Sequence, residues 1–349
     1  MKKLKIADRL IGEGAPCFII AEAGVNHNGD INLAKKLIDV ASRAGVDAIK
    51  FQTFRAEEIV TEIAEKAEYQ RETTGSEESQ FEMLKTLELP DKSVGELFTY
   101  AQKKGIIFLS TPFDKGSVDL LDKLGVPAFK VGSGEITNFP LLKYIAGKQK
   151  PVILSTGMST LDEVIEAVEV MRKEGSREIA LLHCVSCYPA RVEDTNLKAI
   201  ETLKRKCNLP VGLSDHSVGI YIPIAAVALG TCIIEKHFTL DKNLPGPDHR
   251  ASLEPAELKE MVAAIRDIES AMGNGIKRPT AGEEETKKAA RRSLVARTNI
   301  PAGTVISEDT LDIKRPGTGL SPSLIDTVIG KKAKKRITRG EVITRDKLT

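Results

Sequence analysis

The chain of 349 residues is long enough for one large domain and a smaller one, and with 41% hydrophobic and 29% charged residues it has the composition of an ordinary soluble protein. A net charge of +2 argues against a general binder of nucleic acid or other polyanions. No apolar run approaches the roughly 20 residues of a membrane helix, and the basic start Met1-Lys-Lys-Leu-Lys lacks the apolar stretch of a signal peptide, so we expect a cytoplasmic location without membrane attachment.

Apolar, β-rich runs alternate with amphipathic helical stretches along most of the chain. The predicted strands are Cys17–Gly24, Ala48–Phe54, Ile106–Phe113, Ala128–Glu135, Pro151–Met158, Ile179–Cys187, Pro210–His216 and Cys232–Thr239. Helices are predicted between and after them, among them Asn32–Gly45, Thr160–Gly175 and Glu254–Gly273. Eight such β units predict a TIM barrel. A doubly wound open sheet also alternates, but polar residues follow nearly every strand here rather than one switch point.

The longest predicted connection, Arg55–Pro90, is highly polar, and we expect it to be an active-site lid or substrate loop. After the last helix the periodicity stops. This change predicts a barrel domain over residues 1–275, a linker over 276–292 and a small β-rich domain over 293–349.

The small domain has two features of its own. It contains two similar phrases, IPAGTVIS from Ile300 and ITRGEVIT from Ile337. Residues 283–349 hold 15 Lys/Arg and 9 Asp/Glu, so they carry +6 and the rest of the chain carries −4. This basic tail is expected to dock on an acidic surface or to help hold an anionic ligand.

Polar side chains gather where the predicted strands end, which is where TIM barrels carry their chemistry. They are Glu22, Lys50, Gln52, Thr111, Lys130, Ser133, Glu135, Ser155, Ser186, Tyr188, Ser214, His216, Glu235 and His237. Because side chains alternate between the two faces of a strand, Lys50 and Gln52 share a face, and so do Glu235 and His237. An outward orientation would bury charges under the helices, so these faces are predicted to point into the barrel.

Two kinds of site follow from these residue types. His216 and His237 end neighbouring strands, each with an acid or hydroxyl on its own face, which favours a metal site with positions left open to water and substrate. His183 stands alone and is expected to be structural. Two strand lysines with Thr111, Ser133, Ser155 and Ser214 favour an anionic substrate with a phosphate and a carboxylate.

The segments AEAGVNHNGD, IKFQTF, STPFD, KVGSGE, ILSTGM, HCVSCYPA, GLSDHS, EKHFT and PGPDH, with KRPG in the tail, resemble the sialic acid synthase family along essentially the whole chain. The tail is similar to the family's antifreeze-like SAF domain. The resemblance implies condensation of phosphoenolpyruvate with an open-chain N-acetylated mannosamine, which gives a nine-carbon 2-keto acid and phosphate.

The resemblance also implies residue roles. Phosphoenolpyruvate would be held by Lys50, Gln52, Thr111, Lys130, Ser133, Ser155 and Ser214. A divalent cation, Mn or Mg, would be bound by His216 and His237 and would activate the sugar aldehyde. Glu22 and Glu135 would transfer protons, and Glu235 would position water. Tyr188 and Asp248 match sugar-binding positions, and Arg315 matches an arginine that reaches the substrate of a partner subunit in a domain-swapped homodimer.

The choice of sugar stays open at this point. Ser186 stands where N-acetylneuraminate synthases often have Asn, and the segment TTGSEESQFEML resembles the branch that makes N,N'-diacetyllegionaminate from 2,4-diacetamido-2,4,6-trideoxymannose, which we favour slightly over N-acetylmannosamine. A 3-deoxy-ulosonate phosphate synthase would need further basic residues for its phosphorylated aldose. A metal-dependent hydrolase would need more metal ligands, and a carbohydrate- or ice-binding protein would have no use for the strand-end residues.

Overall fold

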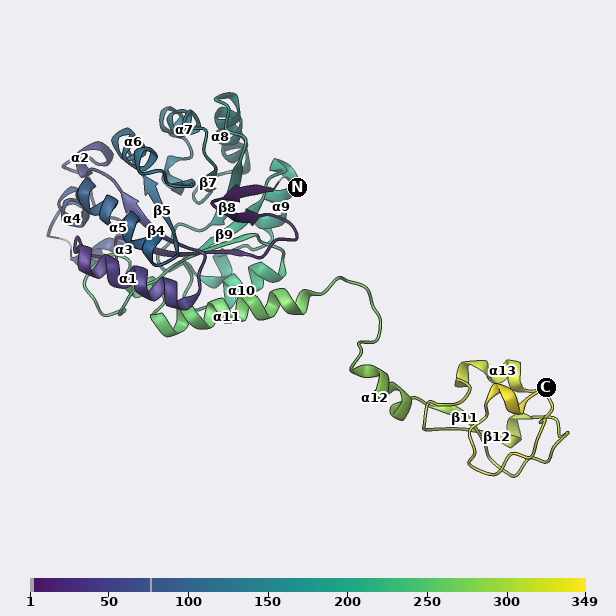
Figure 1. Ribbon diagram of the computed structural model, residues 1–349. Coiled ribbons are helices and arrows are strands. Elements are labelled where there is room, and N and C mark those ends of the chain that lie inside the picture. Colours follow the sequence, from purple (N-terminus) through teal and green to yellow (C-terminus); the bar gives the residue numbers. More distant parts are fainter. Residues whose placement is uncertain (1–2, 76) are drawn as a thin grey trace. The chain divides into compact units, whose positions relative to one another are not determined.

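The eight predicted strands form one parallel sheet in the computed structural model, which describes residues 3–75 and 77–349 (Figure 1). They are β3 Phe18–Gly24, β4 Ala48–Thr53, β5 Ile107–Pro112, β6 Phe129–Val131, β7 Val152–Ser155, β8 Ile179–Cys184, β9 Val211–Asp215 and β10 Ile233–His237. Their order is β5-β4-β3-β10-β9-β8-β7-β6, and the two outer strands, β5 and β6, contact each other. The sheet therefore curls into a nearly closed barrel, and the predicted TIM-like fold is confirmed.

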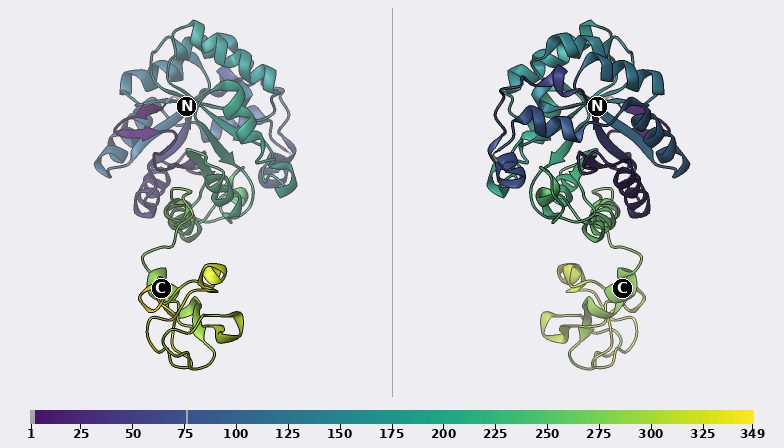
Figure 2. Two further views of the ribbon diagram at one scale, coloured as in Figure 1. Left: turned by 90° about the vertical axis from the view of Figure 1, so that its right-hand side faces the viewer. Right: turned by 90° about the vertical axis from the view of Figure 1, so that its left-hand side faces the viewer.

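Helices alternate with the barrel strands along the chain and surround the barrel (Figure 2). They are α1 Ile31–Ala44, α5 Asp91–Lys103, α6 Lys115–Leu124, α7 Phe139–Ala146, α8 Leu161–Lys173, α9 Ala199–Cys207, α10 Tyr221–Ala228 and α11 Pro255–Met272. Capping residues fix the ends of α1: the Asp30 side chain accepts a hydrogen bond from the backbone N–H of Asn32, and Gly45 ends the helix with a left-handed φ of 81°. The three helices named in the sequence prediction are thus confirmed.

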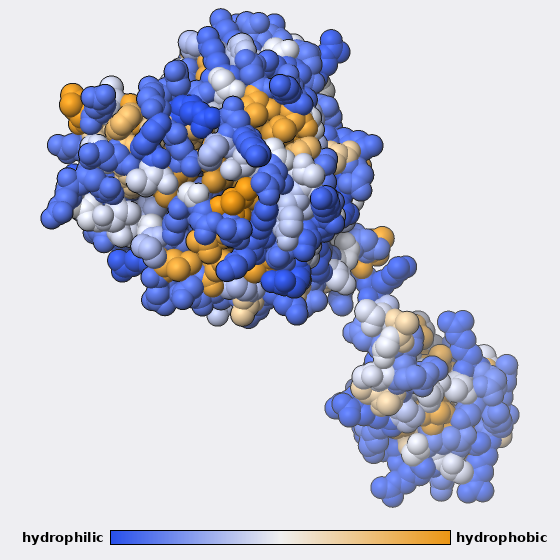
Figure 3. All heavy atoms as spheres, turned by 60° about the vertical axis from the view of Figure 1, so that its left-hand side comes forward, coloured by the Kyte–Doolittle hydropathy of each residue, from blue (hydrophilic) through white to orange (hydrophobic). Residues whose placement is uncertain are grey.

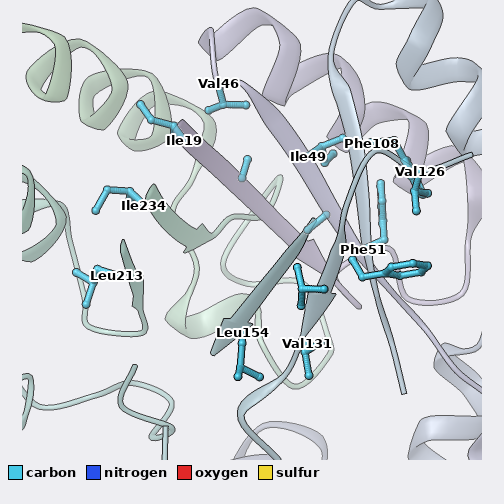
Figure 4. Close-up of a cluster of buried hydrophobic side chains, with 14 of the residues drawn as sticks. Ile19, Val46, Ile49, Phe51, Phe108, Val126, Val131, Leu154, Leu213 and Ile234 are labelled. Carbon is cyan, nitrogen blue, oxygen red and sulfur yellow. The ribbon is translucent and has the colours of Figure 1, made fainter. Parts of the chain in front are cut away.

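The two faces of the barrel strands bury different layers. Alternate strand residues such as Ile19, Ile49 and Ile234 pack outward against the helices, and Figure 4 shows part of this layer. The intervening residues, among them Ile20, Leu109 and Ile153, fill the interior. Because the period of a strand is two, the same alternation decides which of the later, polar residues face inward.

A hairpin that the sequence did not predict closes the N-terminal end of the barrel. Strands β1 Leu4–Ile6 and β2 Arg9–Ile11 pair antiparallel. Leu4, Ile6 and Ile11 are buried in one cluster with the interior barrel residues. Each strand has only three residues, too few for periodicity to indicate them. The interior is therefore blocked at this end, and its polar end is the opposite one.

The predicted lid is not an irregular loop. It contains α2 Ala56–Ile59, α3 Glu68–Thr74 and α4 Gln80–Leu87. Met83 and Leu87 of α4 are buried against Val25 and Phe54 of the barrel. Ser76 of this segment, like Met1 and Lys2 of the basic start, lies outside the described residues.

The chain divides into two units, one ending at Gly273 and the other spanning Asn274–Thr349. The second unit holds α12 Glu283–Ala290, β11 Ser293–Ala296, β12 Leu311–Lys314 and α13 Ile325–Val328. Helix α12 falls within the stretch expected to be a linker without periodicity. Its first turn is acidic and its last turn basic, which stabilises a helix that buries none of its residues.

The two similar phrases of the second unit pair with each other. Ile300 and Ile337 exchange backbone hydrogen bonds of 2.8 and 2.9 Å. The phrases turn at Gly303 and Gly340, whose φ values of 81° and 83° belong to the left-handed region that glycine adopts without strain. Both isoleucines are buried in a hydrophobic core confined to this unit.

Hydrophilic side chains cover most of the face of each unit shown in Figure 3. In the described part of the chain, no helix combines the length and the apolar character that crossing a membrane requires.

Candidate active site

The inward faces of the barrel strands become polar at their C-terminal ends and line a cavity of about 470 Å³. Strand register sets neighbours directly: Glu22 pairs with Lys50 on one side and with His237 on the other, and Glu235 pairs with Ser214. Of the residues predicted from the sequence, those that line the cavity are Glu22, Lys50, Gln52, Thr111, Lys130, Ser133, Ser155, Ser186, Tyr188, Ser214, His216, Glu235 and His237.

Two buried lysines and two buried carboxylates lie at the centre of this cavity. Nζ of Lys50 is 2.7 Å from Oε2 of Glu22 and 3.8 Å from Oε1 of Glu235. Nζ of Lys130 lies 3.6 Å from that same oxygen of Glu235. The four charges balance, so each ammonium is held in place by a carboxylate when no anion is bound.

Hydroxyl groups form hydrogen bonds with three of these four charged side chains. Lys50 donates to Thr111 Oγ1 at 3.0 Å, and Lys130 donates to Ser155 Oγ at 2.7 Å. Ser214 donates its hydroxyl to Glu235 at 3.1 Å. Cations and hydroxyls that converge in one buried space suit a small dense anion.

Burial and mutual charge shift the pKa values of this group in different directions. Burial, with the nearby Glu235, raises the pKa of Glu22 to about 7 against the opposing effect of Lys50. Burial lowers the pKa of Lys130. Burial would raise the pKa of Glu235, but Lys130 and Lys50 outweigh it and lower that pKa. Glu22 is thus the carboxyl that can hold or release a proton near neutral pH.

Two imidazoles stand on the other side of the carboxylates. The rings of His216 and His237 are 5.3 Å apart, centroid to centroid. Nδ1 of His216 is 2.7 Å from the carbonyl oxygen of Val185, which can only accept, so Nδ1 carries the proton and Nε2 offers a lone pair. Nδ1 of His237 is buried without a hydrogen-bond partner in the described structure, 3.8 Å from Oδ2 of Asp248.

These imidazoles fit a divalent cation with two protein ligands. Burial, together with His216, holds the pKa of His237 well below its ordinary value, so that ring is neutral as ligation requires. Burial would lower the pKa of His216, but its contact with the Cys184 thiol raises it. A raised pKa favours a second proton on the ring, at Nε2, and a cation bound there would displace that proton. Within residues 3–75 and 77–349 no group of three or more His, Cys, Asp or Glu is arranged to hold a metal ion.

Three predicted residues do not line the cavity. Glu135 is half-buried and accepts a hydrogen bond of 2.7 Å from Asn138. Asp248 is buried and meets the site through His237, and burial raises its pKa to about 6. Arg315 belongs to the second unit, where it is exposed. As expected, His183 has a structural partner, the carbonyl oxygen of Thr195 at 2.7 Å.

The sequence prediction missed a neutral wall of the cavity, which we call the lid wall. It consists of Ala67, Tyr69, Gln70 and Gln80. Phe113, Met158 and Cys184 were missed as well. Nothing in the pattern of Arg55–Pro90 distinguishes the residues of the lid wall from their polar neighbours, so a tertiary structure is needed to find them.

The loop that carries Asp248 is held by residues of the AEAGVNHNGD segment. Asn26 donates to the carbonyl oxygen of Phe238 at 2.9 Å and to Ser252 Oγ at 3.0 Å. Asn28 donates to the carbonyl oxygen of Pro245 at 2.8 Å. This segment therefore supplies Glu22 to the cavity and fixes the position of a second acid from a distant loop.

The position of this polar cavity, at the C-terminal ends of the barrel strands, is the one at which TIM-barrel enzymes carry their active sites, and its buried lysines and hydroxyls suit an anion. The NeuB family model matches residues 37–277 and the SAF domain model matches residues 291–349. The chain therefore belongs to the NeuB family and is an enzyme of the sialic acid synthase type, as the resemblance implied.

Individual relatives agree with this assignment. An N,N'-diacetyllegionaminic acid synthase of Campylobacter jejuni subsp. jejuni serotype O:2 is 52% identical over 93% of this chain and 98% of the relative. Another, from Legionella pneumophila, is 47% identical over 95% of this chain and 94% of the relative. The crystal structure of the N-acetylneuraminic acid synthetase of Leptospira borgpetersenii in complex with citrate matches with a TM-score of 0.72 and 40% identity, over 82% of this chain and 95% of that one.

Proposed function

We propose that the enzyme condenses phosphoenolpyruvate with open-chain 2,4-diacetamido-2,4,6-trideoxymannose and water to give N,N'-diacetyllegionaminate and phosphate. The observation that carries the proposal is the convergence of Lys50 and Lys130 on one cavity with His216 and His237. The two relatives named as diacetyllegionaminate synthases support this sugar over N-acetylmannosamine.

The floor of the cavity would bind phosphoenolpyruvate. Lys50 and Lys130 would turn from Glu22 and Glu235 toward the phosphate and carboxylate, and the hydroxyl and amide groups would complete the contacts. These groups are Gln52, Thr111, Ser133, Ser155 and Ser214. Because the lysines are already held in the cavity, little ordering of their side chains is needed.

The sugar would place its aldehyde carbon beside the methylene carbon of phosphoenolpyruvate. When bound by His216 and His237, Mn²⁺ or Mg²⁺ supplies Lewis-acid polarisation of the aldehyde oxygen. The methylene carbon forms the new C–C bond to the aldehyde carbon, and the aldehyde oxygen becomes a hydroxyl. This bond uses the electrons of the enol double bond and leaves C2 electron-deficient, so water adds there. One proton of the water balances the proton taken up by the former aldehyde oxygen. The other leaves with phosphate when the bond between C2 and the phosphate oxygen breaks and the 2-keto group forms.

Glu22 is the group we assign to proton transfer, since its pKa of about 7 lets it give a proton to the new hydroxyl or take one from water. Glu235 would orient that water through its free oxygen, because Oε2 of Glu235 has no hydrogen-bond partner in the described structure. Tyr188 and Asp248 would contact the sugar. Glu135 would act only after moving from Asn138.

Purified enzyme with Mn²⁺ is expected to release phosphate from phosphoenolpyruvate only when a sugar is also present, and faster with the diacetamido sugar than with N-acetylmannosamine. Phosphate and the 2-keto acid are measured together. Release without sugar would indicate a hydrolase, and preference for a phosphorylated aldose would indicate a 3-deoxy-ulosonate phosphate synthase.

For the metal site, His216→Ala and His237→Ala are each expected to weaken Mn²⁺ binding by more than about 100-fold, because each removes one of only two protein ligands. Binding is measured from the electron paramagnetic resonance signal of free Mn²⁺, which is independent of turnover. His183→Ala is the matched control, since His183 bonds to Thr195 and should leave Mn²⁺ binding unchanged. Equal affinity in all variants would place the metal elsewhere.

We further propose that residues 276–292 link a barrel domain to a SAF domain at 293–349, which reaches over the barrel of a second copy in the cytoplasm. The tail carries +6 and the remainder −4, so the two attract. Exposed apolar side chains that follow neighbouring strands β7, β8 and β9 favour a partner surface at the mouth; they are Met158, Val192, Val218 and Tyr221.

Complementation tests this arrangement. Arg315→Ala and Lys130→Met are each expected to be nearly inactive alone, whereas their purified heterodimer should recover about half of the wild-type activity, because one of its two sites has both an intact barrel and an intact arginine. Activity is assayed on doubly tagged dimers, and sedimentation confirms their size. Failure to recover activity would show that Arg315 does not act across subunits.

A further inference from the structure

The lid wall is firmly built although it lies in a long connection. Lys66 has a buried side chain, and its Nζ donates to Thr74 Oγ1 at 2.9 Å, to the carbonyl oxygen of Gly75 at 3.1 Å and to Glu78 at 2.8 Å. The backbone N–H of Gln80 donates to Ala64 at 3.1 Å. These bonds tie the start, the middle and the end of the segment together, so the lid wall presents a fixed surface to the cavity.

Amide groups line this wall in a defined pattern. The side-chain oxygen Oε1 of Gln70 accepts from the backbone N–H of Ala67 at 3.0 Å and from Nε2 of Gln80 at 3.3 Å, and Nε2 of Gln70 donates to the Tyr69 hydroxyl at 3.3 Å. Gln70 is buried, and its Oε1 already accepts from two donors. Gln80 is half-buried and donates one N–H of its side-chain amide to Gln70, so its side-chain oxygen and its second N–H can face a ligand.

An aromatic stack connects the lid wall to the imidazoles. The Tyr69 ring lies 5.0 Å from that of Tyr188 at an interplanar angle of 29°, and Tyr188 lies 4.0 Å from the ring of His216. The sugar aldehyde belongs near His216 in the proposed reaction. The remainder of an open-chain sugar would therefore extend along Tyr69 toward Gln80.

The chemistry of this wall selects a particular kind of substrate end. An acetamido group offers one N–H, one carbonyl oxygen and a methyl group, and a primary amide can pair with the first two. An aromatic face buries methyl and C–H groups favourably. All members of the lid wall are uncharged, so a phosphate at this end would lose its hydration without a cation in return.

We propose that Tyr69 and Gln80 form a specificity subsite that recognises the second acetamido group and the deoxy methyl end of the acceptor sugar. The inference rests on the proposed condensation but concerns a different part of the substrate from the reacting carbon. The two residues determine which sugar is used, while the lysines and imidazoles carry out the reaction that all such sugars share.

The test compares Gln80→Leu and Tyr69→Leu with wild type on the diacetamido sugar and on N-acetylmannosamine. Each variant is expected to lower kcat/KM for the diacetamido sugar about tenfold, because a polar or aromatic partner of a buried group is lost. For N-acetylmannosamine the change should stay below about threefold, since that sugar lacks the second acetamido group. The KM for phosphoenolpyruvate should not change. Gln102→Leu, an exposed position on α5, is the matched control.

Calorimetry with the two sugars reduced to alditols separates recognition from turnover. If Gln80→Leu loses binding of the diacetamido alditol but not of the other alditol, the subsite is supported. This holds even if the wild-type enzyme forms no product, a result that would overturn the proposed reaction but not the subsite. Equal losses for both sugars would show that the wall is structural support, and no loss for either would also overturn the inference. Wild-type preference for N-acetylmannosamine would overturn it while leaving the condensation intact.

Discussion

Replacing Lys130 with Met is expected to lower kcat/KM for phosphoenolpyruvate by about 100- to 1,000-fold, the range found when one hydrogen-bond donor to a reacting oxyanion is removed. Lys130 has no solvent that could replace it, because it is buried beside Lys50, Ser155 and Glu235. Without it, Glu235 keeps only Lys50 as a cation, and an entering anion would face a net negative cavity. Steady-state rates with phosphoenolpyruvate as the varied substrate measure the effect.

The fold should tolerate this change. Loss of Lys130 leaves Glu235 with Lys50 at 3.8 Å and the Ser214 hydroxyl at 3.1 Å, so no buried carboxylate loses its last partner charge. We expect a melting temperature within a few degrees of wild type. A folded variant whose kcat/KM falls less than fivefold would rule out Lys130 as a substrate ligand.

Lys236→Met should have the opposite profile, with a loss of about 3–5 kcal/mol in the free energy of unfolding and little loss of activity per folded molecule. Lys236 lies between Glu235 and His237 in sequence but points away from the cavity. Its Nζ is 2.5 Å from Oδ2 of Asp215, and both side chains are buried. Removing the ammonium leaves the carboxylate of Asp215 buried without its partner charge.

Urea unfolding measures the stability loss, and titration of active sites corrects the rate for unfolded protein. The double variant Asp215→Asn/Lys236→Met should recover part of the stability because it removes both charges together. If Lys236→Met were as stable as wild type but inactive, the assignment of this residue to the outer layer would be wrong.

The contrast between Lys130 and Lys236 shows what the sequence could predict. Alternation along a strand separates Glu235 and His237 from Lys236, so the inward convergence follows from the pattern once the barrel is inferred. The eight strands were recoverable because each is an apolar run with polar residues at its end. The paired cations and the imidazoles of the site were predictable for the same reason.

Other parts carry no such signal. The hairpin β1–β2 and helix α12 are short, and their positions depend on packing or end charges rather than on periodicity. Tyr69 and Gln80 reach the cavity only because α3 and α4 fold back over the mouth of the barrel. Arg315 shows the converse: its motif is recognisable from the sequence, whereas in the structure it is an exposed residue of the second unit.

Hairpin β1–β2 closes the N-terminal end of the barrel, so the polar cavity is open only toward the C-terminal ends of the strands. A molecule that binds at Lys130 therefore has to enter at the mouth of the barrel, where Tyr69 and Gln80 are part of the cavity lining. If the proposed reaction takes place there, phosphoenolpyruvate is expected to bind before the sugar, an order that initial-rate kinetics would reveal.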